Sequence, residues 1–229
     1  KVEVPSHRLF RDMHVLQVEG QGDYEAYPNR DSISYIDVYG LQGIQTMFRG
    51  TLRNVGWCDC LYHYGQLGLL SLDEVDVKGK TYAQLVRGLV GAGPQDDLRA
   101  AVAKKLGIPA DALPAWNLHW LGMLSDRPFK VDRISPLDAM GDLMYEKLAF
   151  KPGERDMIVL YHHFRAELPG GKRERIVSSL IDYGIPNGDS SMSRTVSLPA
   201  AIGVHLILSG KIGARGVLVP VAADVYNPV

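Results

Sequence analysis

The sequence predicts an α+β protein in which a long helical segment interrupts a β-sheet. Apolar residues alternate with a period of two before residue 55, recur with a period near 3.6 between 56 and 150, and alternate again from 156. These are the side-chain periods of a strand and of a helix. We therefore expect residues 1–55 and 151–229 to form a sheet-plus-helix domain, and residues 56–150 to form an inserted helical domain.

The first elements are predicted to be two strands joined by a turn. Residues 13–18 alternate in polarity, residues 20–23 are glycine-rich and polar, and residues 24–27 resume the strand pattern before Pro28. A strand–turn–strand unit is typical of such a pattern.

A short helix and a third strand are expected next. Asp31 or Ser32 can cap a helix that ends at Tyr39 before Gly40. Residues 44–53 then read as a strand whose faces alternate. One face carries Gln45, Met47, Arg49, Thr51 and Arg53, and the other carries Ile44, Thr46, Phe48 and Leu52. Gly50 lies within this strand, and a glycine there is expected to leave room for a ligand close to the backbone.

Five helices are predicted between residues 56 and 150. Glycines, N-cap residues and prolines mark their ends. The expected spans are Cys58–Leu67, Thr81–Val90, Pro94–Leu106, Ala112–Leu124 and Pro136–Phe150. Aromatic and methionine side chains recur at helical spacing on the last two spans, and we interpret them as core rather than as a cofactor site.

Strand character returns near the C-terminus. Residues 156–164 and 173–182 are predicted to form a hairpin around the turn at 169–172. An apolar helix is expected at residues 190–209, bent by Pro199. Its N-terminus offers donors for an anion, although a capped core helix is the favoured interpretation.

Composition argues against several functional classes. The 229 residues carry a net charge of −1, which gives no electrostatic argument for binding nucleic acid or an anionic membrane surface. No apolar run approaches the roughly 20 residues that span a bilayer. Cys58 and Cys60 are the only cysteines, so a reducing cytoplasm is expected. The chain has no initiator methionine, and we expect it to be part of a longer protein.

Neither a metal site nor a dinucleotide site is predicted in this chain. His162 and His163 are neighbours on a strand and so face opposite ways, no HExxH pattern occurs, and the two cysteines are poorly spaced for chelation. Gly20 and Gly22 begin a GxGxxG pattern, but Glu25 replaces its third glycine and no helix follows.

Residues 27–53 carry the clearest indication of a ligand. Arg30, Arg49 and Arg53 fall within this stretch. Arginine is always charged and binds carboxylates through two parallel hydrogen bonds. The cluster suits a ligand with several carboxylates, although solvated surface charges explain the spacing equally well.

A series of motifs runs through the whole chain. They are YPNRDS (Tyr27–Ser32), VYG (Val38–Gly40), RGTLR (Arg49–Arg53), WLG (Trp120–Gly122), GERDMIV (Gly153–Val159), MSRTVSLP (Met192–Pro199) and GVL (Gly216–Leu218). In this order they resemble the C-terminal catalytic domain of the saccharopine dehydrogenase family. The glutamate-forming branch is the closer match, and it includes the second half of aminoadipic semialdehyde synthase.

The resemblance implies a fold and a reaction. The fold is a dihydrodipicolinate-reductase-like sheet domain with a large all-helical insertion, whose N-terminal Rossmann domain is absent from this chain. The reaction interconverts saccharopine with glutamate and 2-aminoadipate 6-semialdehyde, with NADP or NAD bound mainly by the Rossmann domain. The fragment alone is expected to be inactive, and a homodimer is expected because closed symmetric dimers are common. The alternative is a non-catalytic dimerisation or amino-acid-binding module of the same fold.

The resemblance also implies a set of substrate-binding residues. They are Asn29, Arg30, Arg49, Thr51, Leu52 and Arg53. Arg30 and Arg53 would clamp carboxylates of the ligand while Thr51 and the local backbone orient it. Arg49 would support the clamp. No residue is assigned as the acid or base of catalysis, and no cofactor-binding or metal-binding residue is expected in this segment.

Overall fold

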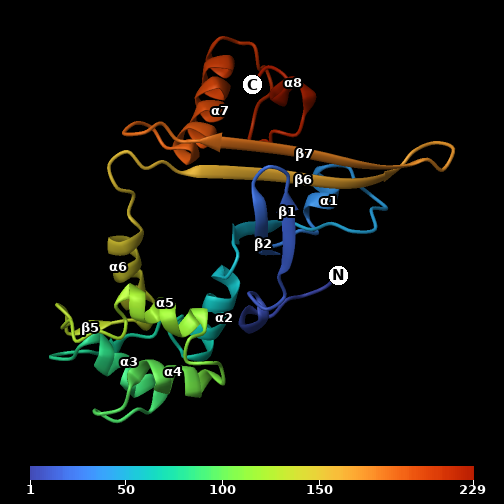
Figure 1. Ribbon diagram of the computed structural model, residues 1–229. Helices are drawn as coiled ribbons and strands as arrows, with labels where there is room; N and C mark the ends of the chain where they lie inside the picture. Colours follow the sequence, from blue (N-terminus) through green and yellow to red (C-terminus); the bar gives the residue numbers. More distant parts are fainter. The chain divides into compact units, whose positions relative to one another are not determined.

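Contacts in the computed structural model, which describes residues 1–229, divide the chain into two units. Unit 1 contains residues 1–30 and 48–149, and unit 2 contains residues 31–47 and 150–229. Both units mix helices with strands (Figure 1), as the predicted α+β class requires. The first sheet groups with the helices because its strands pack on them directly. We expected one domain of residues 1–55 together with 151–229 and a second domain of residues 56–150. This division stays a prediction about the family's domain architecture.

Unit 1 begins with a three-stranded antiparallel sheet. Its strands are β1 (His14–Val18), β2 (Gly22–Pro28) and β3 (Gly50–Asn54), with β2 in the centre and a 3-10 turn, η1 (Ser6–Arg8), before them. The predicted hairpin is confirmed. The strand predicted at 44–53 is wrong in its first half, since pairing with β2 begins only at Gly50. Arg30 explains this, because its left-handed backbone (φ 55°) turns the chain out of the ladder.

Five helices and one short ladder complete unit 1. The helices are α2 (Trp57–Gln66), α3 (Tyr82–Val90), α4 (Leu98–Leu106), α5 (Leu113–Leu121) and α6 (Pro136–Leu148), and the ladder pairs β4 (Val75–Asp76) with β5 (Arg133–Ile134). All five predicted helices are present, and Thr81 caps α3 as expected. Helix α4 begins at Leu98 rather than Pro94, because the Asp97 carboxylate accepts the N–H of Ala100 at 3.1 Å and so caps the helix there.

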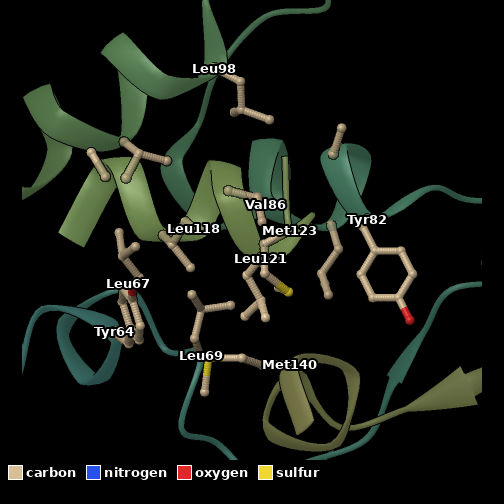
Figure 2. Close-up of a cluster of buried hydrophobic side chains, with 14 of the residues drawn as sticks. Tyr64, Leu67, Leu69, Tyr82, Val86, Leu98, Leu118, Leu121, Met123 and Met140 are labelled. Carbon is tan, nitrogen blue, oxygen red and sulfur yellow. The ribbon is translucent and has the colours of Figure 1, made fainter. Parts of the chain in front are cut away.

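The helices of unit 1 enclose an apolar core, shown in Figure 2. Leu118 of α5 and Met140 of α6 are buried in it, which confirms the interpretation of these stripes as core. Trp116 and Trp120 are exceptions, because 49% and 47% of their surfaces stay exposed. Both rings instead carry a cation, Arg99 over Trp116 and Lys147 over Trp120.

A buried carboxylate fastens the sheet of unit 1 to helix α2. Glu25 in β2 is 3% exposed, and its two oxygens accept the backbone N–H of Gly56 at 2.8 Å and of Cys58 at 2.7 Å. Gly56 is the N-cap of α2 and has no side chain to satisfy these donors. A negative charge at a helix N-terminus is further favoured by the helix dipole. Glu25 therefore caps α2 from the neighbouring strand.

Unit 2 consists of a long hairpin, helix α7 and two single-turn helices. Its elements are α1 (Tyr35–Val38), β6 (Met157–Glu167), β7 (Arg173–Tyr183), α7 (Ser191–Leu208) and α8 (Ala223–Tyr226). The hairpin and α7 agree with the prediction, with Pro199 inside the helix. Helix α1 is shorter than predicted, because the Asp31 carboxylate binds the N–H of Ile33 in a turn before the helix begins.

The N-terminus of α7 is closed by carboxylates of unit 2 itself. Asp156 accepts the backbone N–H of Ser191 at 2.7 Å and of Met192 at 2.8 Å. The N–H of Met192 is the largest cause that holds the pKa of Asp156 below its ordinary value. Arg194 pairs with Asp182 at 2.7 Å. The helix is therefore capped as expected, and the donors proposed for an external anion are already in use. The expectation of a core helix is wrong, because only Ser191 and Leu206 of α7 are buried.

Replacing Glu25 with alanine is expected to lower the free energy of unfolding by about 3 kcal/mol, because two donors at the start of α2 lose a charged acceptor. Denaturant unfolding of the purified protein measures this change. Glu19→Ala is the matched control, because Glu19 is an exposed glutamate near the same hairpin. Equal stability of the two variants would contradict the capping role.

Candidate functional site

Thr51 and Arg53, two of the predicted ligand-binding residues, share one face of β3, and Arg49 directly precedes this strand. Thr51 pairs with Tyr27, Arg53 pairs with Glu25, and the carbonyl of Arg49 accepts the N–H of Asn29 at 3.0 Å. Side chains two residues apart on a strand point to the same side. We call this side of β3, with Thr51 and Arg53 on it and Arg49 just before it, the arginine face.

The remaining predicted residues lie around this face or behind it. Leu52 pairs with Ala26 and points to the opposite side of the sheet, so only its backbone lies among the arginine-face residues. Asn29 and Arg30 follow β2 directly, at the end of the ladder where β3 begins. Both are exposed.

Arg30 has an unusual backbone. Its φ of 55° is in the left-handed region, which Asn187 is the only other non-glycine residue to occupy. For an ordinary side chain this conformation costs about 1–2 kcal/mol. Its guanidinium has no hydrogen bond or ion pair within the chain. Strained backbone that carries an unpaired charge is more frequent at functional sites than elsewhere.

Arg53 also keeps most of its donors available. Its guanidinium makes one long hydrogen bond, from Nη1 to its neighbour's carbonyl, that of Leu52, at 3.3 Å, and it takes part in no ion pair. Its Cζ lies over the ring of Trp57, 5.5 Å from the ring centroid. Most of the donors that bind a carboxylate are thus available, while the flat side of the group rests on an aromatic ring.

Gly50 does not leave room for a ligand, and that expectation is wrong. A Cβ at this position would lie 2.6 Å from the ring of Phe48 and 2.8 Å from the carbonyl of Tyr27. The Phe48 ring, which also packs edge-on against His14, fills the space. Glycine is needed here for packing within the sheet.

Burial favours the protonated form of the two cysteines in α2, Cys58 and Cys60. Burial, followed by the hydrogen bond with Glu25, raises the pKa of the Cys58 thiol to about 12. Burial also raises the pKa of Cys60. Both thiols are therefore protonated at neutral pH, and thiolate chemistry requires the deprotonated form.

The described residues do not form a metal cluster or a dinucleotide site. No group of three or more His, Cys, Asp or Glu side chains converges as metal ligands do. Gly20 lies in the turn between β1 and β2, Gly22 is the first residue of β2, and Gly91 ends helix α3. None of these glycines joins a strand to a helix N-terminus. None of the helices combines the length and apolar character needed to cross a bilayer.

Two neighbours of Arg53 were missed by the sequence analysis. Glu25 stands in an ordinary strand pattern, where a charged residue usually faces water. Trp57 stands at a helix start with no motif of its own. A glutamate between Tyr24 and Ala26, both buried, is a weak signal that only the structure makes specific.

Comparisons with known proteins agree with one another. The whole chain, residues 1–229, matches the family model of the saccharopine dehydrogenase C-terminal domain. It is 38% identical over 213 residues to the mitochondrial alpha-aminoadipic semialdehyde synthase of Bos taurus, covering 90% of this chain and 23% of that protein. It is 32% identical over 224 residues to the saccharopine dehydrogenase (NADP(+), L-glutamate-forming) of Schizosaccharomyces pombe, covering 90% of this chain and 48% of that protein.

A solved structure shares the fold. The apo saccharopine dehydrogenase (L-Glu forming) of Saccharomyces cerevisiae matches with a TM-score of 0.87 and 29% identity, over 96% of this chain and 51% of that one. The chain thus spans from 23% to 51% of the length of these relatives. Fold and matches together define a mixed helix-and-sheet domain from an oxidoreductase family. The chain belongs to the saccharopine dehydrogenase C-terminal domain family, and the resemblance seen in its motifs is confirmed.

The backbone strain at Arg30 predicts a difference between two substitutions. Arg30→Gly should be more stable than Arg30→Ala by about 0.5–1 kcal/mol, because glycine adopts the left-handed conformation without a steric cost and loses part of that gain to chain entropy. Denaturant unfolding of both variants measures the difference. Greater stability of the alanine variant would show that φ at this position is not positive.

Proposed function

We propose that the complete protein interconverts saccharopine with glutamate and 2-aminoadipate 6-semialdehyde in lysine metabolism, and that this chain supplies the substrate-binding wall. One observation carries the proposal: Arg53 and Thr51 share the arginine face, and Arg30 follows the adjacent strand with its donors unpaired. These residues stand in the motifs that resemble the family's saccharopine contacts. The names of the relatives support the same substrate.

The geometry of the arginine face suits this ligand. Saccharopine carries three carboxylates and two amines along an extended skeleton. Arg53 lies in β3, and Arg30 follows the adjacent strand β2, so the two guanidinium groups come from different strands. Two separate cations can bind different carboxylates of one extended molecule. In this proposal Arg30 and Arg53 clamp carboxylates while Thr51 orients the ligand.

The hydride acceptor belongs to another part of the protein in this proposal. The glycine turns of this chain do not fit a dinucleotide, so a Rossmann domain outside it would bind NADP or NAD. This chain contributes binding and orientation of the substrate. We also keep a dihydrodipicolinate-reductase-like sheet domain as the proposed architecture. A cytoplasmic location stays a prediction, because some matched relatives are named as mitochondrial.

We also propose a homodimer. Leu160 pairs with Leu180, and Phe164 pairs with Ile176, on one side of the β6–β7 hairpin. All four side chains are about half exposed. An apolar strip of this kind on a sheet is typical of a surface that another protein surface covers. The alternative function, a non-catalytic dimerisation or amino-acid-binding module of the same fold, is supported by the same strip.

Saccharopine-dependent reduction of NAD(P)⁺ by the complete protein tests the proposed function. We expect reduction of one cofactor or both, followed at 340 nm, and none when saccharopine is replaced by lysine. Saccharopine binding in a calorimeter without turnover would favour the non-catalytic module. Absence of both binding and turnover would contradict the proposal.

Arg30→Ala and Arg53→Ala are each expected to weaken saccharopine binding by about 1.5–3 kcal/mol, the usual contribution of a hydrogen bond to a charged group. The Michaelis constants of the complete variants measure this loss. Arg133→Ala is the control, because Arg133 forms only an exposed ion pair with Glu74. Unchanged Michaelis constants in both site variants would place the substrate elsewhere.

A further inference from the structure

Trp57 lies directly beside the arginine proposed to hold a substrate carboxylate. It is the first residue of α2, and Cζ of Arg53 lies over its ring, 5.5 Å from the centroid. The arrangement is a cation–π contact, in which tryptophan is the strongest of the aromatic partners. The guanidinium makes no ion pair within the chain, and its one hydrogen bond is the long bond to the Leu52 carbonyl. The ring is therefore the main constraint on the orientation of Arg53.

The indole of Trp57 does not hold its place by hydrogen bonding. Its Nε1 is buried and has no acceptor. Buried tryptophan N–H groups usually find a partner, and leaving one unpaired costs free energy. A ring that is kept in place despite this cost is held there by other contacts, and the Arg53 guanidinium on its face is one of them.

Glu25 binds the backbone on either side of Trp57. The two donors bound by the Glu25 carboxylate are the N–H groups of Gly56 and Cys58, the residues immediately before and after Trp57. Glu25 is also the cross-strand partner of Arg53 in the β2–β3 ladder. One buried residue thus fixes the backbone position of the ring and of the arginine that rests on it.

We propose that Trp57 is a positioning residue for the substrate. Its ring sets the plane of the Arg53 guanidinium so that the donor fork points toward the ligand's carboxylate, and Glu25 holds the ring in register with Arg53. Preorganisation of this kind lowers the entropy that a flexible arginine loses when it binds. The inference rests on the proposed function, because it concerns how the same site binds saccharopine.

Steady-state kinetics of the complete protein test this role. Trp57→Leu should raise the Michaelis constant for saccharopine by about 3- to 30-fold, the effect of losing a cation–π contact of about 0.6–2 kcal/mol, with a smaller change in kcat. Trp57→Phe keeps a ring and should recover most of the loss. Trp116→Leu is the matched control, because Trp116 also carries a cation, Arg99 at 5.6 Å, in the same unit. It should leave the Michaelis constant unchanged.

A double-mutant cycle separates positioning from packing. In the Arg53→Ala background, Trp57→Leu should have no further effect on the Michaelis constant, because the group that the ring orients is gone. A purely structural tryptophan would weaken binding equally in both backgrounds, and that result would overturn the proposal. Thermal unfolding of each variant identifies a folding defect, in which case Trp57→Met, which also removes the ring, replaces Trp57→Leu in the cycle.

The outcomes also distinguish this inference from the function on which it rests. A wild-type protein that neither binds nor turns over saccharopine contradicts the proposed function itself. Wild-type turnover that is sensitive to Arg53→Ala but not to Trp57→Leu overturns only the positioning role. If both Arg53→Ala and Trp57→Leu raise the Michaelis constant and their effects are not additive, the proposed function and the positioning role of Trp57 are both supported.

Discussion

The site in unit 1 depends on one buried carboxylate. The side chain of Glu25 extends from the central strand β2 and accepts hydrogen bonds from two backbone N–H groups at the start of α2. Burying a charge is costly unless it is fully hydrogen-bonded, so the sheet and the helix cannot move apart without leaving that charge poorly paired. The same carboxylate contributes to the raised pKa of Cys58, which keeps a thiol, rather than a second negative charge, next to it.

Unit 2 uses the same device. There Asp156, just before strand β6, binds the first N–H groups of α7. In both units a carboxylate from the sheet takes the donors that a helix N-terminus would otherwise offer to an external anion. The cationic groups left available to a ligand in unit 1 are therefore side chains, with Arg30 and Arg53 foremost. This favours recognition of a substrate by the planar fork of arginine over recognition by backbone donors.

The comparisons identify the family of this chain, and the β2–β3 register explains the arrangement of its RGTLR motif. The comparisons place it in the saccharopine dehydrogenase C-terminal domain family and show that it corresponds to only part of the length of its relatives. The register of the β2–β3 ladder explains why residues of one short motif lie on one face. The proposed substrate site rests on the motif and on this register together.

The sequence by itself determined the elements whose signal is local. The hairpin at 13–27, the five helices of unit 1, helix α7 and the alternation of Thr51 and Arg53 all follow from side-chain period and capping residues. Tertiary structure alone decided where β3 begins, what fills the space at Gly50, and which groups surround Arg53. The reason is distance along the chain: Glu25 binds donors 31 and 33 residues away. No local pattern encodes a contact between such remote positions, and burial is what turns an ordinary strand glutamate into the cap of a helix.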